Sequence, residues 1–157
     1  MNRLVDEVIV ERARALSAAA RAGQKRDNGT DYALHPAATA ELLRVSGLGD
    51  TATLAAAYLH DVLEDTDIGE EALRQAFGPE TTGLVVEVTN RGPEGRTFAE
   101  KQAALLERAR RMSRRAKLVK LADRWHNLRE DGLADVDAAA LRRGHAGTAR
   151  STASVAR

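Results

Sequence analysis

The 157-residue sequence contains no cysteine and very few aromatic residues. Without cysteine, disulfide bonds, thiolate zinc sites and thiol nucleophiles are excluded, so any metal ion must bind to His, Asp and Glu side chains. Aromatic residues make up 3% of the chain and alanine accounts for 30 residues, a composition that favours close-packed helices over an aromatic-rich β-sandwich. No apolar run approaches the ~20 residues of a membrane-spanning helix, and the N-terminus does not resemble a signal peptide, so we expect a cytoplasmic protein.

Charge is unevenly distributed along the chain, although 24 basic and 23 acidic residues give a net charge of only +1. The segment from Arg108 to the C-terminus carries a net charge of +8, which leaves −7 on residues 1–107. Such a split is compatible with a solvated basic helix face, with nucleic-acid binding, or with a local site for an anionic ligand. Nucleic-acid binding is the weakest of these interpretations, because the basic helices lack aromatic residues on which bases can stack.

The spacing of apolar residues is helical along most of the chain and predicts a single all-α bundle of about seven helices. Residues 54–63 are apolar almost all round, so we expect them to form the central buried helix, capped by Asp50 or Thr51. The other helices are expected at residues 4–22, 36–45, 67–77, 80–90, 97–111 and 116–129.

The expected ends of two segments depend on capping and on composition. Asp67 is a suitable cap for the short helix that Gly78-Pro79 closes. The apolar pattern weakens after Gly132, so residues 1–132 are expected to form the domain. Residues 133–157 are then expected to be a weakly structured or disordered tail.

Ionisable residues occur in the expected central helix, where isolated charges are costly. His60 and Asp61 follow an apolar run and precede two further apolar residues, and such neighbours are expensive to bury unless they are paired or bound to a metal. Glu64 and Asp65 come four residues later, so on a continuous helix His60 would lie under Glu64 and Asp61 under Asp65.

Three separate segments together supply nitrogen and oxygen ligands. His35, His60-Asp61 and Asp123 offer two imidazoles and two carboxylates, a set that suits a divalent ion such as Mn²⁺, Fe²⁺ or Zn²⁺. Taken singly, His35 is explained by a cap or a core hydrogen bond and Asp123 by a surface ion pair. In combination they indicate a catalytic metal site, at which Glu64 and Asp65 orient and deprotonate a water molecule.

The segments around these residues resemble the hydrolase domain of the RelA/SpoT homologue family, within the HD-domain phosphohydrolase superfamily. The resemblance extends over roughly residues 5–130, and its most specific parts are the patterns HDxxED and LADRxxN in that order. The matching segments are Leu34–Pro36, Ala57–Thr66, Phe77-Gly78, Val86–Thr89 and Lys120–Arg129. The length of the chain resembles the stand-alone small alarmone hydrolases of the metazoan SpoT-like type.

The resemblance implies a Mn²⁺-dependent hydrolase that releases pyrophosphate from the 3′ position of the guanine nucleotide (p)ppGpp. It implies that Glu64 and Asp65 serve the hydrolytic water, that Lys25 and Arg26 in a basic loop contact the substrate, and that Asn127 contacts the ribose. The implied ligands of the Mn²⁺ ion are His35, His60, Asp61 and Asp123.

Three acidic residues depart from the family pattern. Asp27 and Asp31 lie in the basic loop, and Glu130 follows Asn127 by three residues. Negative charge beside an anionic substrate predicts weaker binding or a different substrate. The alternatives are therefore an HD-type phosphohydrolase acting on another nucleotide, such as the 2′-phosphate of NADPH, or a non-catalytic nucleotide-binding module. The oligomeric state stays open.

Overall fold

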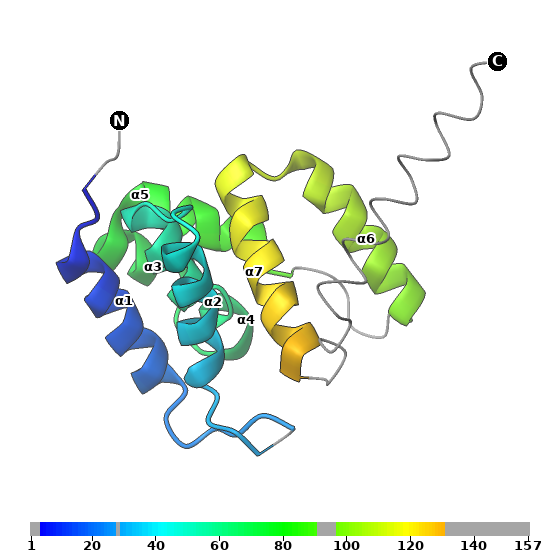
Figure 1. Ribbon diagram of the computed structural model, residues 1–157, viewed down its shortest axis with the longest axis horizontal. Helices are drawn as coiled ribbons and strands as arrows, with labels where there is room; N and C mark the ends of the chain where they lie inside the picture. The colour runs from blue at the N-terminus through cyan, green and yellow to red at the C-terminus, as the bar shows by residue number, and fades with distance from the viewer. Residues whose placement is uncertain (1–3, 28, 91–96, 131–157) are drawn as a thin grey trace. The chain divides into compact units, whose positions relative to one another are not determined.

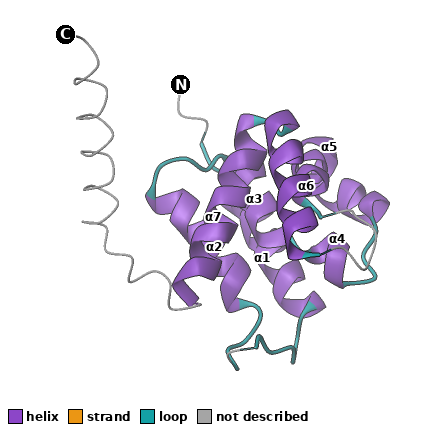
Figure 2. Ribbon diagram, turned by 90° about the vertical axis from the view of Figure 1, so that its right-hand side faces the viewer, coloured by secondary structure: helices purple, strands orange, loops and turns teal. Residues whose placement is uncertain are grey.

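The computed structural model describes residues 4–27, 29–90 and 97–130, and within these ranges the chain is helical, with no β-strand (Figure 1, Figure 2). The expected all-α fold is therefore confirmed for this part of the chain. The helices are α1 (Glu7–Ala20), α2 (Leu34–Val45), α3 (Thr51–Leu59), α4 (Val62–Asp65), α5 (Glu70–Val88), α6 (Phe98–Arg111) and α7 (Arg114–Glu130).

The chain divides into two compact units, residues 1–124 and residues 125–157. Of the second unit the structure describes residues 125–130, which form the last part of α7. The predicted tail, residues 133–157, lies outside the described residues, so the end of the domain at residue 132 stays a prediction. None of the helices in the described ranges combines the length and the apolar composition that crossing a membrane requires.

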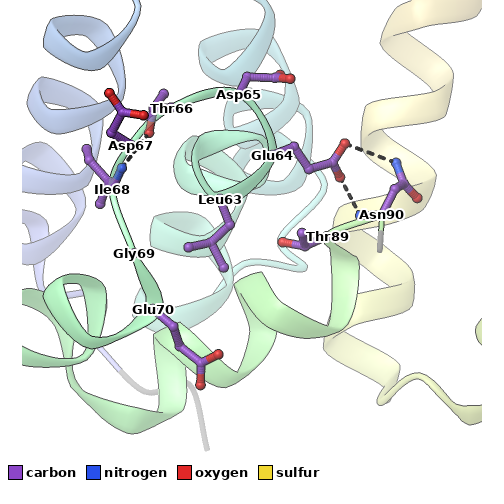
Figure 3. A pocket seen from close by; sticks show the side chains of 10 residues that line it. All are labelled: Leu63, Glu64, Asp65, Thr66, Asp67, Ile68, Gly69, Glu70, Thr89 and Asn90. Carbon is purple, nitrogen blue, oxygen red and sulfur yellow. Dashed lines mark hydrogen bonds between the residues drawn. The ribbon is translucent and has the colours of Figure 1, made fainter. Parts of the chain in front are cut away.

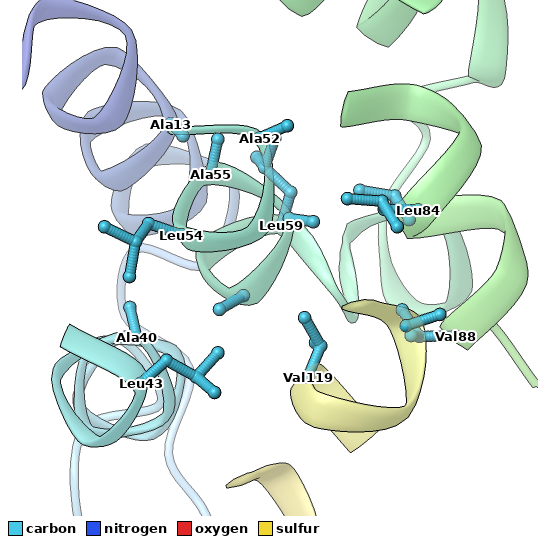
Figure 4. Close-up of a cluster of buried hydrophobic side chains, with 14 of the residues drawn as sticks. Ala13, Ala40, Leu43, Ala52, Leu54, Ala55, Leu59, Leu84, Val88 and Val119 are labelled. Atoms are coloured by element: carbon cyan, nitrogen blue, oxygen red, sulfur yellow. The ribbon is translucent and has the colours of Figure 1, made fainter. Parts of the chain in front are cut away.

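Helix α3 is the centre of the first unit, as its composition predicts. Seven of its nine residues are buried, and it packs against α1, α2 and α5. Its alanines allow these helices to approach closely, and Figure 4 shows its side chains among Ala13 of α1, Leu43 of α2 and Val88 of α5. The predicted cap is confirmed, because the Asp50 carboxylate accepts the backbone N–H of Thr53 at 2.9 Å.

Helix α3 ends at Leu59, four residues before its predicted end. His60 and Asp61 form a turn between α3 and the single helical turn α4. The carbonyl oxygen of Asp61 accepts the N–H groups of both Glu64 and Asp65 at 3.1 Å, so the chain restarts helical hydrogen bonding there. The prediction that His60 lies under Glu64 on one helix face is therefore wrong. The break turns His60 into the interior and leaves Glu64 exposed.

Helix α5 is interrupted at Gly78, whose φ of 79° and ψ of 170° are not helical. Pro79 then starts the second part of α5, a position at which its missing N–H costs nothing. The predicted break at Gly78-Pro79 is confirmed, as is helix for most of residues 80–90. The prediction that Asp67 caps the first part of α5 is wrong, because the N-cap residue is Gly69. The turn before α5 is stabilised by Thr66, whose hydroxyl accepts the N–H of Ile68 at 3.2 Å.

Replacing Gly78 with alanine should lower the free energy of unfolding by about 1–3 kcal/mol, because only glycine adopts this conformation without strain. An added methyl group would meet no heavy atom within 4 Å, so the cost is conformational and not steric. Gly83→Ala is a matched control in the helical part of α5, with equally open surroundings, and should raise the stability by about 0.5–1 kcal/mol. Urea denaturation compares the two, and effects of the same sign would contradict the argument.

Helix α7 buries a face that is not purely apolar. Val119 lies in the core, but Lys120 and Asp123 are buried beside it. Leu121, which was expected to contribute to the apolar face, is 66% exposed. The position of α7 in the first unit therefore places an amine and a carboxylate in the interior, where each requires a partner.

Candidate metal centre and active site

The interior of the first unit contains two histidines and an aspartate from segments far apart in the sequence. His35 lies in the first turn of α2, His60 follows α3, and Asp123 lies on α7, and all three are buried. The two histidine Nε2 atoms are 3.2 Å apart. The Oδ1 atom of Asp123 lies 3.2 Å from Nε2 of His35 and 3.8 Å from Nε2 of His60. One ligand atom from each residue lies within 4.8 Å of the other two, so a single ion can contact all three.

Asp61 lies at the edge of this cluster. Its Oδ2 atom is 3.2 Å from Nε2 of His60, and the same oxygen accepts the hydroxyl of Tyr32 at 2.9 Å. Burial opposes the charge on Asp61, but His60 and the Tyr32 hydrogen bond outweigh it and hold the pKa of this carboxyl well below its usual range. The structure thus brings together all four residues that the sequence selected as metal ligands.

The orientation of His60 is fixed by its other ring nitrogen. Nδ1 lies 2.7 Å from the carbonyl oxygen of Ala57, which can only accept a hydrogen bond, so Nδ1 carries the proton. The lone pair of neutral His60 is then on Nε2, which faces His35, Asp61 and Asp123. Metal-binding histidines are held in this way by a backbone carbonyl or a carboxylate. The cluster is therefore a candidate site for a divalent metal ion.

The charges of the cluster stabilise one another. Burial lowers the pKa of His60, but Asp61 and Asp123 more than compensate, so the pKa lies above its ordinary value. Burial raises the pKa of Asp123, but the His35 hydrogen bond and the charges of His60 and Lys120 lower it to about 2. Both carboxylates therefore carry a negative charge at neutral pH, the form in which they bind cations.

Lys120 is a part of the site that the sequence pattern did not select. Its Nζ lies 3.3 Å from Oδ2 of Asp123 and donates to the carbonyl oxygen of Val88 at 3.3 Å. Asp123 therefore forms an ion pair, as expected for this residue taken singly, but the pair is buried beside the cluster and does not lie on the surface. The position of Lys120 between two core residues, Val119 and Ala122, is the sequence signal for the burial of Lys120.

Glu64 and Asp65 lie on α4, the helical turn that follows His60 and Asp61, but their side chains point in different directions. Figure 3 shows Glu64 directed toward Asn90, and its carboxylate accepts the backbone N–H of that residue. Partial desolvation and the charges of Asp61 and Asp65 raise the pKa of Glu64, although the Asn90 N–H opposes them. Glu64 and Asp65 line a cleft of about 640 Å³ together with Thr66, Asp67 and the end of α5.

Asp65 is held by Arg21, a second residue that sequence reasoning did not select. Arg21 is 2% exposed, and its guanidinium forms an ion pair with Asp65 and lies 3.7 Å from the centre of the Tyr32 ring. Arg21 continues the buried face of α1, on which Ala13 and Ser17 are also buried. That helical spacing was the available signal.

The predicted substrate contacts are placed in two regions. Lys25 is exposed in the loop between α1 and α2, where its backbone forms an isolated antiparallel β-bridge with the backbone of Asp31. The guanidinium of Arg26, in the same loop, lies 5.6 Å from the centre of the Tyr32 ring. Asn127 lies in α7 one helical turn beyond Asp123, in the second unit of the chain.

Comparison with known proteins identifies the family. The model of the HD domain matches residues 13–149. The guanosine-3′,5′-bis(diphosphate) 3′-pyrophosphohydrolase MESH1 of Drosophila melanogaster is 40% identical over 108 residues, which are 68% of this chain and 59% of the fly protein. A probable guanosine-3′,5′-bis(diphosphate) 3′-pyrophosphohydrolase of Synechocystis is 45% identical over 114 residues, covering 69% of this chain and 15% of that protein.

A solved structure agrees with the family model. The structure of a metazoan ortholog of SpoT, described as hydrolysing ppGpp, matches with a TM-score of 0.72 and 34% identity, over 82% of this chain and 72% of that one. The chain spans 59% of the fly relative and a small part of the cyanobacterial one. With its buried His and Asp cluster, the chain therefore belongs to the HD-domain family and is a homologue of the metazoan SpoT-like hydrolases.

Proposed function

We propose that the protein is a Mn²⁺-dependent (p)ppGpp 3′-pyrophosphohydrolase, which releases pyrophosphate and leaves GDP or GTP. One observation carries the proposal. His35, His60 and Asp123 form a buried cluster with Asp61 at its edge. The single helical turn that follows Asp61 carries two carboxylates, Glu64 and Asp65, which line a cleft. Two of the relatives, which are 45% and 40% identical to this chain, are named for the 3′-pyrophosphohydrolase reaction.

The ion is proposed to be held by the two histidines and the two aspartates of the cluster. HD domains bind divalent metals, and the imidazole and carboxylate donors fit Mn²⁺, with Fe²⁺ and Zn²⁺ as the alternatives. When bound, the ion supplies Lewis acidity, which acidifies a coordinated water and stabilises charge on phosphoryl oxygens. Lys120 holds Asp123 from the other side, so that only one of its oxygens is directed at the histidines.

Glu64 and Asp65 are proposed to divide the work on the hydrolytic water. Glu64 has a raised pKa, which makes its carboxylate a better proton acceptor near neutral pH than an ordinary glutamate. Asp65 is fixed by the Arg21 guanidinium, which suits a carboxylate that orients the water. The attacking oxygen must be aligned with the phosphorus–oxygen bond that breaks, so orienting the water contributes to the rate in addition to removing its proton.

The loop between α1 and α2 is proposed to bind the nucleotide through Lys25 and Arg26, and Asn127 to contact the ribose. Two backbone hydrogen bonds hold the loop: the Arg26 N–H donates to the carbonyl oxygen of Thr30 at 2.9 Å, and the Tyr32 N–H donates to the carbonyl oxygen of Gln24 at 3.1 Å. Arg26 therefore presents a guanidinium beside an aromatic ring, a pair that suits an anionic nucleotide with a flat base. The Asp31 carboxylate accepts the N–H of Ala33 at 3.0 Å in the turn that precedes α2, so this acidic side chain has a structural use.

Incubation of the purified protein with ppGpp and Mn²⁺ tests the proposal. We expect one pyrophosphate and one GDP per ppGpp, with chelator-sensitive turnover and a metal content near one ion per chain. NADPH in a parallel reaction, followed by phosphate release, tests the alternative nucleotide. Turnover of NADPH but not of ppGpp would replace the substrate, and bound metal without turnover of either would indicate a binding module.

A further inference from the structure

Arg21 is a buried cation at the C-terminal end of α1, next to the proposed active site. Its guanidinium forms an ion pair with the carboxylate of Asp65, and its Nη2 donates to the carbonyl oxygen of Asp61 at 3.2 Å. The Asp61 carboxylate is 4.0 Å away, and Nη1 donates to the side chain of Gln24 at 3.4 Å. The flat face of the guanidinium covers the ring of Tyr32.

These contacts join segments that lie up to 44 residues apart in the sequence. They connect the end of α1, the loop between α1 and α2, and the turn that carries His60 and Asp61 into α4. Tyr32 closes the arrangement, because its ring lies against Arg21 while its hydroxyl donates to Asp61 at 2.9 Å. The guanidinium of Arg21 therefore connects the loop that contains Lys25 and Arg26 to the segment that contains Asp61 and Asp65.

The exposure of Asp65 shows what Arg21 contributes. The side chain of Asp65 is 44% exposed, whereas that of Arg21 is 3% exposed. An exposed aspartate with no fixed partner samples several rotamers, and ordering it costs conformational entropy. A buried guanidinium is already ordered and offers a rigid fork of donors, so it can hold the carboxylate in one orientation.

We propose that Arg21 is a positioning residue, which fixes the Asp65 carboxylate and connects the loop between α1 and α2 to the turn that precedes α4. The proposal rests on the function proposed above, because Asp65 is the group through which Arg21 acts. It predicts that loss of the guanidinium lowers kcat far more than it changes KM for ppGpp. It also predicts that the loss has little effect once Asp65 has no charge to hold.

A double-mutant cycle tests this coupling. Arg21→Met, which keeps the apolar length of the side chain, should lower kcat by about 10- to 100-fold, the scale expected for misplacement of a catalytic group. Arg21→Lys should recover part of the loss, because an ammonium can still pair with Asp65 but provides no flat fork. In an Asp65→Asn background, Arg21→Met should change the residual kcat by less than about threefold.

Arg115→Met is the matched control. Arg115 also joins two carboxylates, Asp50 at 3.0 Å and Glu80 at 2.8 Å, but at the other end of α3. Its loss should lower the melting temperature and leave kcat within about twofold. Circular dichroism of each variant separates unfolding from a catalytic effect, and Arg21→Lys remains informative if Arg21→Met does not fold.

A crystal structure of the Arg21 variant provides a readout that does not depend on turnover. We expect Asp65 to occupy more than one rotamer in Arg21→Met or Arg21→Lys and a single one in Arg115→Met. An unchanged Asp65 side chain, or the same loss of kcat with and without the Asp65 charge, would overturn the proposal. If the wild-type protein did not hydrolyse ppGpp, the proposed function would fail, and the Asp65 rotamer would still decide the role of Arg21.

Discussion

Replacing Asp61 with alanine should remove both the bound metal and the hydrolysis of ppGpp, with a loss of at least about a thousandfold in kcat/KM, or about 4 kcal/mol of transition-state stabilisation. The Oδ2 atom of Asp61 lies 3.2 Å from Nε2 of His60 and accepts the Tyr32 hydroxyl, so removal of the carboxylate takes one negative charge from the cluster and leaves the Tyr32 hydroxyl without its acceptor. Turnover measured together with metal content by elemental analysis checks the result.

Asp67→Asn is the control for this loss. Asp67 is an exposed carboxylate in the same part of the chain, and it lines the cleft without belonging to the cluster. Its neutralisation should leave metal content unchanged and activity within about twofold. Full metal content in Asp61→Ala would show that this aspartate is not a ligand, even if turnover were lost.

Glu64→Gln should lower kcat by about 10²- to 10⁴-fold and leave the metal content unchanged, because an amide keeps the size of the side chain but cannot accept a proton from water. The raised pKa of Glu64 gives this prediction a second readout. The carboxylate must be deprotonated to act as a base, so wild-type kcat should fall with decreasing pH while the pH is still above the ordinary pKa of a glutamate. That acid limb should be missing from the residual activity of the variant.

Glu70→Gln controls for a general effect of charge in the cleft. Glu70 lines the same cleft, but its carboxylate pairs with Arg74 at 2.9 Å on α5. An exposed pair of this kind contributes little to stability, so activity should change by less than about twofold. Equal losses of bound metal in Glu64→Gln and Asp61→Ala would assign Glu64 to metal binding and not to proton transfer.

The fold was largely predictable because most of it follows from local rules. The apolar run of α3 can be stable only in an interior, the Asp50 cap fixes its start, and Gly78-Pro79 interrupts any helix that reaches it. The end of α3 was not predictable in the same way. The sequence around His60 continues the helical pattern, and the break occurs where His60 meets His35 of α2 and Asp123 of α7, residues that are distant in the sequence.

The candidate site was predictable in its chemistry but not in its surroundings. In an apolar context His60 and Asp61 have few explanations, so these two residues stood out by themselves, and His35 and Asp123 stood out only in combination with them. Arg21 did not, because a charged residue near the end of a helix is normally solvated. Its burial depends on Asp61 and Asp65, which follow it by 40 and 44 residues, and no local pattern specifies such a partner.

The wide spacing of the cluster along the chain has a consequence for the abundance of the protein. Its members lie between residues 35 and 123, so the ligands meet only after most of the first unit has folded. An ion that binds the folded chain and not the unfolded one adds about 2.7 kcal/mol to stability at a hundred times its dissociation constant. The supply of divalent metal in the cell would then set how much folded protein escapes proteolysis, and with it the total capacity for turnover.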